Sequence, residues 1–131
     1  MTQRGLLLFA HGARDARWAR PFEDVVARVR AAAPAVAVEL AYLEFMRPGL
    51  LEAGARLAAG GCTRVDVVPL FLGAGGHVRR DVPDLFAHLQ RAHEGVTWRL
   101  QPAIGEAGAV LQAMADVALA RLAAGDDAAM E

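Results

Sequence analysis

The stretch GLLLFAHG (residues 5–12) decides the fold, because apolar side chains follow one another through it until the polar His11. A strand that is apolar on both sides is typical of a parallel sheet with both faces covered. The stretch RVDVVPL (residues 64–70) is again mostly apolar. These two segments are therefore predicted to be the central strands of a parallel sheet.

Two further segments alternate along the chain between large apolar side chains and mostly small or polar ones. They are VAVELAYL (36–43) and VTWRL (96–100). Such alternation is typical of strands at the edges of a sheet, where one face is less completely covered. The four strands are therefore expected in the spatial order 2-1-3-4.

Apolar residues at helical spacing separate the strands. Pro21 suits a first helical position, and the helix that it opens is expected to end near Pro34. Further helices are expected over residues 48–60, 82–89 and 105–124, and the last of them is expected to cover the sheet. Strands that alternate with helices indicate right-handed crossovers, so we predict a doubly wound α/β fold, with a four-stranded parallel sheet and helices on both faces.

Length and composition fit one soluble domain. The chain has 131 residues, of which 55% are hydrophobic and 22% charged, and this excludes a disordered chain. No apolar run approaches the roughly 20 residues that span a bilayer. We expect one domain over residues 1–124 and a frayed tail over residues 125–131. A cytoplasmic location is expected because the start lacks the features of a secretory signal.

Residue usage excludes several functions. The net charge of −1 is too balanced for nucleic-acid binding through bulk electrostatics. The chain has no lysine, which excludes a Schiff base and a Walker-type phosphate loop, and it has no serine, which excludes a serine triad. The single cysteine, Cys62, is predicted at the opposite end of the sheet from the candidate site and is expected to be an inert small residue.

Potential metal or proton ligands follow three successive strands. His11 comes directly after the first, Glu44 after the second and His77 after the third, in the segment GAGGH. The carboxyl ends of parallel strands meet at one edge of the sheet, which is where open α/β sheets bind ligands. Two imidazoles and one carboxylate suit iron, cobalt, nickel or zinc and leave coordination positions open for a substrate. The sequence therefore predicts a metal-handling site at this edge.

The other two histidines are interpreted as structural. His88 shares helical spacing with Asp81 and Asp84, on the polar side of the predicted third helix. His93 lies near the end of that helix, where a cation interacts favourably with the helix dipole.

The predicted strand-end loops are basic. Segments 11–20, 44–49 and 73–81 hold six arginines and three acidic residues, a local charge of +3. Arginine binds carboxylates in bidentate fashion, so a basic rim around a His/Glu centre suits a polycarboxylate ligand that meets a metal ion. We expect Arg14, Arg79 and Arg80 to hold such carboxylates.

Four segments together resemble the short, single-domain sirohydrochlorin chelatases of the CbiX type, in the class II chelatase group. They are LLLFAHGAR, VELAYLEFMRPGLLEA, GCTRVDVVPLFLGAGGHVRRDVPDL and QPAIG. The resemblance implies a lyase that inserts cobalt, iron or nickel into sirohydrochlorin without ATP, in cobalamin or sirohaem biosynthesis, with no cofactor besides the metal substrate. It also implies that His11 and His77 are the metal-binding pair, that Glu44 is the acidic residue and that the protein is a homodimer.

Chemistry suggests a division of roles. Neutral His11 and His77 would hold the metal or accept the leaving pyrrole protons, with Glu44 as a base or orienting group. A non-catalytic carrier of metal or tetrapyrrole would use the same loops and stays as the alternative. A flat macrocycle needs a second wall, which a two-fold partner would supply through a contact at Trp18 and Met46.

Overall fold

The computed structural model describes residues 3–73 and 75–130, apart from the side chains of His77, Arg79 and residues 126–130. The strands are β1 (Gln3–Ala10), β2 (Ala37–Tyr42), β3 (Cys62–Pro69) and β4 (Thr97–Leu100). The α-helices are α1 (Arg20–Ala32), α2 (Leu50–Ala59), α3 (Gly76–Ala92) and α4 (Gly108–Met130), and the short 3-10 helices are η1 (Ala16–Ala19) and η2 (Ile104–Glu106).

The strands form one parallel sheet in the order β2-β1-β3-β4. Phe9 of the central strand β1 lies opposite Ala41 of β2 on one side and opposite Pro69 of β3 on the other. Both the order and the parallel sense confirm the prediction. All the carboxyl ends consequently lie at the same edge of the sheet.

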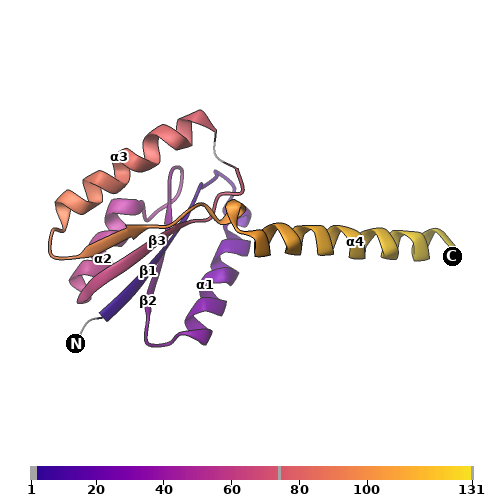
Figure 1. Cartoon of the computed structure of the whole chain (residues 1–131), viewed down its shortest axis with the longest axis horizontal. Helices are drawn as coiled ribbons and strands as arrows, with labels where there is room; N and C mark the ends of the chain where they lie inside the picture. Colours follow the sequence, from indigo (N-terminus) through magenta and orange to yellow (C-terminus); the bar gives the residue numbers. More distant parts are fainter. Residues whose placement is uncertain (1–2, 74, 131) are drawn as a thin grey trace.

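Helices α2 and α3 cover one face of the sheet, and α1 lies on the other (Figure 1). Because successive side chains of a strand point to opposite faces, Leu7 and Phe9 of β1 pack under α2 and α3 together with Leu89. Leu8 points the other way and packs against Val26 of α1. The double-faced coverage explains why β1 is apolar at every position from Leu6 to Ala10.

Helix α1 begins as the sequence predicts, with Pro21 in its first turn. Just before it, Trp18 packs against Phe22 with 4.6 Å between the ring centroids, and it belongs to a buried cluster with Tyr42 and Met46. Trp18 and Met46 are only partly buried in this cluster, and the dimer contact expected at these two residues stays a prediction.

Helix α3 starts at Gly76, six residues before the predicted stretch 82–89. Val78 and Val82 are buried and extend the apolar stripe of the helix toward its start, which is why the helix begins early. Pro83 lies inside the helix. His77, expected in a strand-end loop, therefore has its backbone in the first turn of α3.

Helix α4 differs most from expectation, because it extends away from the sheet instead of covering it (Figure 1). Over Gly108–Gly125 the helix is 0% buried. The corner before it explains the direction: Ala107 donates to the carbonyl of Ile104, and the carbonyl of Ala107 accepts from Val110 and Leu111. The expectation that this helix covers its own sheet was wrong. The boundary between the domain and its tail, expected between residues 124 and 125, stays a prediction.

The composition of α4 is unusual for an exposed helix. Its residues Gly108–Gly125 have a mean hydropathy of 1.2, so by length and composition alone they could cross a membrane, although Gln112, Asp116 and Arg121 interrupt the apolar residues. The side chains of five large apolar residues are about half exposed or more: Leu111, Met114, Val117, Leu119 and Leu122.

Candidate functional site

The candidate site is built on backbone hydrogen bonds that continue past the ends of β1 and β2. The N–H of Leu43 donates to the carbonyl of Ala10 at 2.9 Å, and the N–H of Glu44 donates to the carbonyl of His11 at 3.1 Å. This extension of the parallel ladder holds His11 and Glu44 next to each other at the carboxyl edge.

The side chains of these two residues also meet. Nε2 of His11 lies 3.3 Å from Oε1 of Glu44, and the side chains are 43% and 40% exposed, respectively. An imidazole and a carboxylate at this distance can share a proton or bind one cation together. Because both remain open to solvent on one side, a ligand can reach them from outside the sheet.

Gly12 makes the close approach of the two loops possible. Its φ of +94° lies in the left-handed region, and a Cβ atom at this position would overlap the carbonyl of Glu44. Only glycine fits both requirements without strain. The Gly after His11 is thus a structural requirement of the pair.

The loop after Glu44 is held at two points. The N–H of Met46 donates to the carbonyl of Glu44 at 2.8 Å, which leaves Phe45 with a φ of +66° and a side chain that is 58% exposed. Farther along, Arg47 forms an ion pair of 2.6 Å with Glu52 of α2. The hydrogen bond from Arg47 lowers the pKa of the Glu52 carboxyl.

Aromatic rings border the pair. Phe71, just after β3, is buried and presents its ring to His11 at 5.9 Å between centroids and 74° between planes. The guanidinium carbon of Arg14 lies 5.0 Å from the centre of the exposed Phe45 ring, a cation–π contact. Together they give the site an apolar floor and a cationic rim.

The predicted substrate-binding arginines are placed as follows. Arg14 lies in the loop directly after His11, in the contact with Phe45. Arg80 is exposed in the first turns of α3, and its Nε donates to the carbonyl of Gly76 at 3.3 Å. The side chain of Arg79 lies outside the described residues. The role of all three stays a prediction.

The second predicted imidazole belongs to His77. Its backbone is in the first turn of α3, and its side chain lies outside the described residues. Among the side chains that the structure does describe, no group of three or more His, Cys, Asp and Glu residues could hold a metal ion. The described part of the site therefore brings together His11 and Glu44, and its completion by His77 stays a prediction.

A cleft that the sequence analysis missed begins at Glu44. It has a volume of about 370 Å³ and lies between the loop after β2 and one side of α3. Its lining consists of Leu43, Glu44, Asp81, Asp84, Leu85 and His88. The spacing of Asp81, Asp84 and His88 does place them on one side of the helix, and what the sequence could not show is that this side faces Glu44.

The family model for CbiX matches residues 5–120. The chain belongs to the CbiX family. A sirohydrochlorin cobaltochelatase of Sulfurisphaera tokodaii is 35% identical over 81 residues, which cover 60% of this chain and 64% of that protein. Another, from Saccharolobus solfataricus, is 37% identical over 84 residues, which cover 62% of each protein. The matched segment thus spans less than two thirds of these curated relatives.

Solved structures agree in fold with this CbiX-family chain. A CbiX protein of Marinobacter aquaeolei VT8, described as a cobalamin biosynthesis protein, superposes with a TM-score of 0.79 at 37% identity, over 91% of this chain and 97% of that one. The sirohydrochlorin chelatase SirB of Bacillus subtilis subspecies spizizenii, in complex with cobalt, superposes with a TM-score of 0.75 at 22% identity, over 86% of this chain and 48% of that one. The second likeness concerns the fold alone.

Proposed function

We propose that this CbiX-family protein is a metallochelatase that inserts a divalent metal, cobalt or iron, into sirohydrochlorin without ATP. The observation that carries the proposal is the His11–Glu44 pair, with 3.3 Å between Nε2 and Oε1 at the carboxyl edge of the sheet. Curated relatives with 35% and 37% identity are sirohydrochlorin cobaltochelatases, which supports the choice of substrate.

The pair matches what metal insertion requires. The metal must lose water ligands, reach the plane of the macrocycle and displace two protons from pyrrole nitrogens. A neutral imidazole binds cobalt and iron well, and a neighbouring carboxylate can accept protons from the substrate. We assign metal binding to His11 and His77 and proton removal to Glu44, which takes up each pyrrole proton in turn and releases it to solvent through its exposed side.

Sirohydrochlorin carries several carboxylates, and the arginines near the site suit them. Arg14 extends from the loop after His11, and Arg79 and Arg80 follow His77 in the chain after one intervening residue, Val78. The ring of Phe45, more than half exposed beside Arg14, offers a flat surface for the face of a macrocycle. We propose that these residues orient the substrate over His11 and Glu44.

Three further statements belong to the same proposal. The enzyme needs no cofactor besides the metal that it inserts, it acts in the cytoplasm, and it is a homodimer whose second subunit shields the bound macrocycle. Assays with metal-depleted protein, cell fractionation and light scattering, respectively, test these statements.

Spectroscopy tests the activity directly. Metal-free protein is mixed anaerobically with sirohydrochlorin and Co²⁺, Fe²⁺ or Ni²⁺, and the absorbance of the macrocycle is followed against the reaction without protein. We expect many turnovers per protein molecule with cobalt or iron. A spectral change that stops at one equivalent of protein would identify a carrier, and rates equal to those without protein would refute the proposal.

A further inference from the structure

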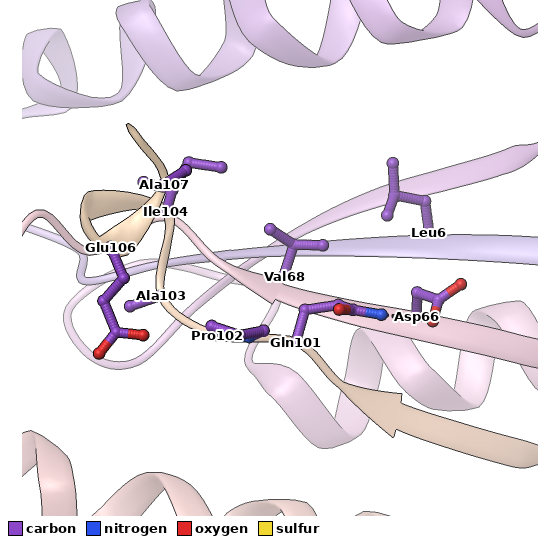
Figure 2. A pocket seen from close by; sticks show the side chains of 9 residues that line it. All are labelled: Leu6, Asp66, Val68, Gln101, Pro102, Ala103, Ile104, Glu106 and Ala107. Carbon is purple, nitrogen blue, oxygen red and sulfur yellow. Dashed lines mark hydrogen bonds between the residues drawn. The ribbon is translucent and has the colours of Figure 1, made fainter. Parts of the chain in front are cut away.

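The segment after β4, residues 101–107, brings a fourth strand end to the edge of the sheet where the candidate site lies. The N–H of Gln101 donates to the carbonyl of Val67 at 2.8 Å, which continues the ladder between β3 and β4. Figure 2 shows the segment where it continues past the end of β4, beside Val68 of β3. Because β4 is parallel to the other strands, the segment starts at the same edge of the sheet as His11.

One hydrogen bond fixes this segment to the loop after β3. The N–H of Gly105 donates to the carbonyl of Phe71 at 2.9 Å. A Cβ atom on Gly105 would overlap backbone atoms of Leu72, so the two stretches of backbone touch with no side chain between them. The requirement for glycine is one of space, because the backbone of Gly105 does not adopt a positive φ.

Phe71 is thereby held from two sides. Toward β1, the N–H of Leu70 donates to the carbonyl of Phe9 at 2.7 Å, which continues the ladder between β1 and β3 up to the residue before Phe71. Toward β4, Gly105 holds the carbonyl of Phe71 itself. The ring of Phe71 is buried and packs on the ring of Phe9, with 5.7 Å between the centroids. Both the backbone and the ring of Phe71 are thus fixed.

The other ring that contacts Phe71 is the imidazole of His11. The two centroids are 5.9 Å apart and the planes meet at 74°, an edge-to-face arrangement. The torsion that turns an imidazole about its Cβ–Cγ bond has broad minima, so a neighbouring group must set the plane of the ring. The contact between His11 and Glu44 joins single atoms, Nε2 and Oε1, and leaves the ring free to tilt about them. Contact with a second, fixed ring restricts that tilt.

We propose that Gly105 and Phe71 are positioning residues for metal transfer, which together fix the plane of the His11 imidazole. This role rests on the function proposed above, in which His11 binds the metal. Neither residue has a side chain that binds metal or accepts a proton, so both act through His11. An imidazole binds metal in the plane of its ring, and the groups around it therefore decide where the metal is held relative to Glu44.

A role in positioning differs from simple filling of the core in what the site requires of residue 71. A leucine would occupy most of the same volume, because cores tolerate exchanges between large apolar side chains of similar size. It would present no flat ring to His11. Phe71→Leu therefore separates the two roles, and Phe71→Met, with a flexible side chain that fills irregular gaps, repeats the separation in a second packing.

Phe71→Leu tests the contact with His11. The turnover number should fall at least about tenfold while the KM for sirohydrochlorin changes less than about twofold, because the ring contacts a metal ligand and not the macrocycle. The visible absorption bands of bound Co²⁺, recorded without sirohydrochlorin, should shift with the changed position of the imidazole. Phe86→Leu is the matched control, since Phe86 of α3 packs against the same core cluster, and it should keep both the turnover number and the bands.

Gly105→Ala tests the contact that holds Phe71. The added methyl group must displace Leu72, so the cobalt bands should shift as in Phe71→Leu and the turnover number should fall at least about fivefold. Gly95→Ala, where a Cβ atom would contact nothing within 4 Å, should match the unaltered protein. Because both residues act through one ring, the double variant should lose no more than about twofold beyond the larger single loss, whereas independent losses would multiply.

Two results would overturn the positioning role. The first is an unchanged turnover number and unchanged cobalt bands in Phe71→Leu and Phe71→Met, with circular dichroism showing that both variants are folded. The second is a double variant in which the losses of Gly105→Ala and Phe71→Leu multiply. Failure of the proposed function would look different, because the unaltered protein itself would then neither bind cobalt nor insert it, and the positioning role would be refuted with it.

Discussion

His11 and Glu44 are joined twice, once through the backbone and once through their side chains. The N–H of Glu44 donates to the carbonyl of His11 at 3.1 Å, and Nε2 of His11 lies 3.3 Å from Oε1 of Glu44. The first contact continues the hydrogen-bond ladder between β1 and β2, so the sheet itself sets the distance between the functional groups. Such preorganisation favours the metal transfer proposed above, because the two side chains need not be brought together from mobile loops.

Glu44→Gln tests the proposed base. Glutamine keeps the size and polarity of the side chain but neither its charge nor its basicity. If Glu44 removes pyrrole protons, turnover should fall by roughly 10²–10⁴-fold while the affinity for sirohydrochlorin changes little. Glu94→Gln, in the exposed loop before β4, is the control and should match the unaltered protein. Equal turnover in both variants would assign Glu44 a structural role.

The two imidazoles are tested by His11→Ala and His77→Ala. Each variant should lose cobalt binding, measured by calorimetry, and turnover, measured by the absorbance of the macrocycle, without a change in circular dichroism. His93→Ala is the matched control, since His93 follows the end of α3 near the amino end of β4, where its backbone carbonyl accepts from Trp98. Full cobalt affinity in His77→Ala would remove His77 from the metal-binding pair.

Gly12→Ala should disturb the fold and the site together. The positive φ of Gly12 is unfavourable for alanine, and the added methyl group would overlap the carbonyl of Glu44. We expect a loss of roughly 1–3 kcal/mol in the free energy of unfolding, seen as a lower melting temperature, and a larger relative loss of turnover because the His11–Glu44 distance changes. Gly73→Ala, where a Cβ atom would contact nothing within 4 Å, should melt like the unaltered protein.

The sheet could be predicted because the positions of the apolar residues in each strand follow from which of its faces other elements cover. Residues 5–10 are apolar because α1 covers one face of β1 and α2 and α3 cover the other, and residues 64–70 are mostly apolar because Val65 and Val67 of β3 pack under α2 and α3. The edge strand β4 alternates because Trp98 points into the core while Arg99 pairs with Asp66 on the side of the sheet that carries α1. The placement of His11 and Glu44 followed from the sheet order, since each comes just after a strand that ends at the same edge.

Two features could not be predicted, because they depend on the orientation of elements rather than on local pattern. The spacing of Asp81, Asp84 and His88 defines one side of α3, but only the packing of α3 beside the loop after β2 turns that side toward Glu44. The course of α4 depends on the hydrogen bonds around Ala107 and on the approach of Gly105 to Leu72, a contact of residues far apart in sequence. The apolar composition of α4 predicts a covered helix, whereas Gly108–Gly125 are exposed in the single chain.

Cys62 provides a test at the other end of the sheet. Burial raises the pKa of its thiol, so the folded protein favours the neutral form. Iodoacetamide should react far more slowly with native protein than with protein unfolded in guanidinium chloride. Thr63→Cys in a Cys62→Ala background, which moves the thiol to an exposed neighbouring position, should react quickly in the native state. Rapid native alkylation of Cys62 would contradict its burial.

The raised pKa of the Cys62 thiol also predicts how the stability of the folded protein changes with pH. A thiol whose folded pKa lies above its unfolded value contributes its full stabilisation below the unfolded pKa, and this contribution decreases as the pH rises through the folded value. The difference in unfolding free energy between the unaltered chain and Cys62→Ala should therefore narrow as the pH is raised from neutral into the alkaline range. Denaturant titrations at a series of pH values measure it. A difference that stays constant or widens would mean that the buried thiol ionises as readily in the folded chain as in the unfolded one.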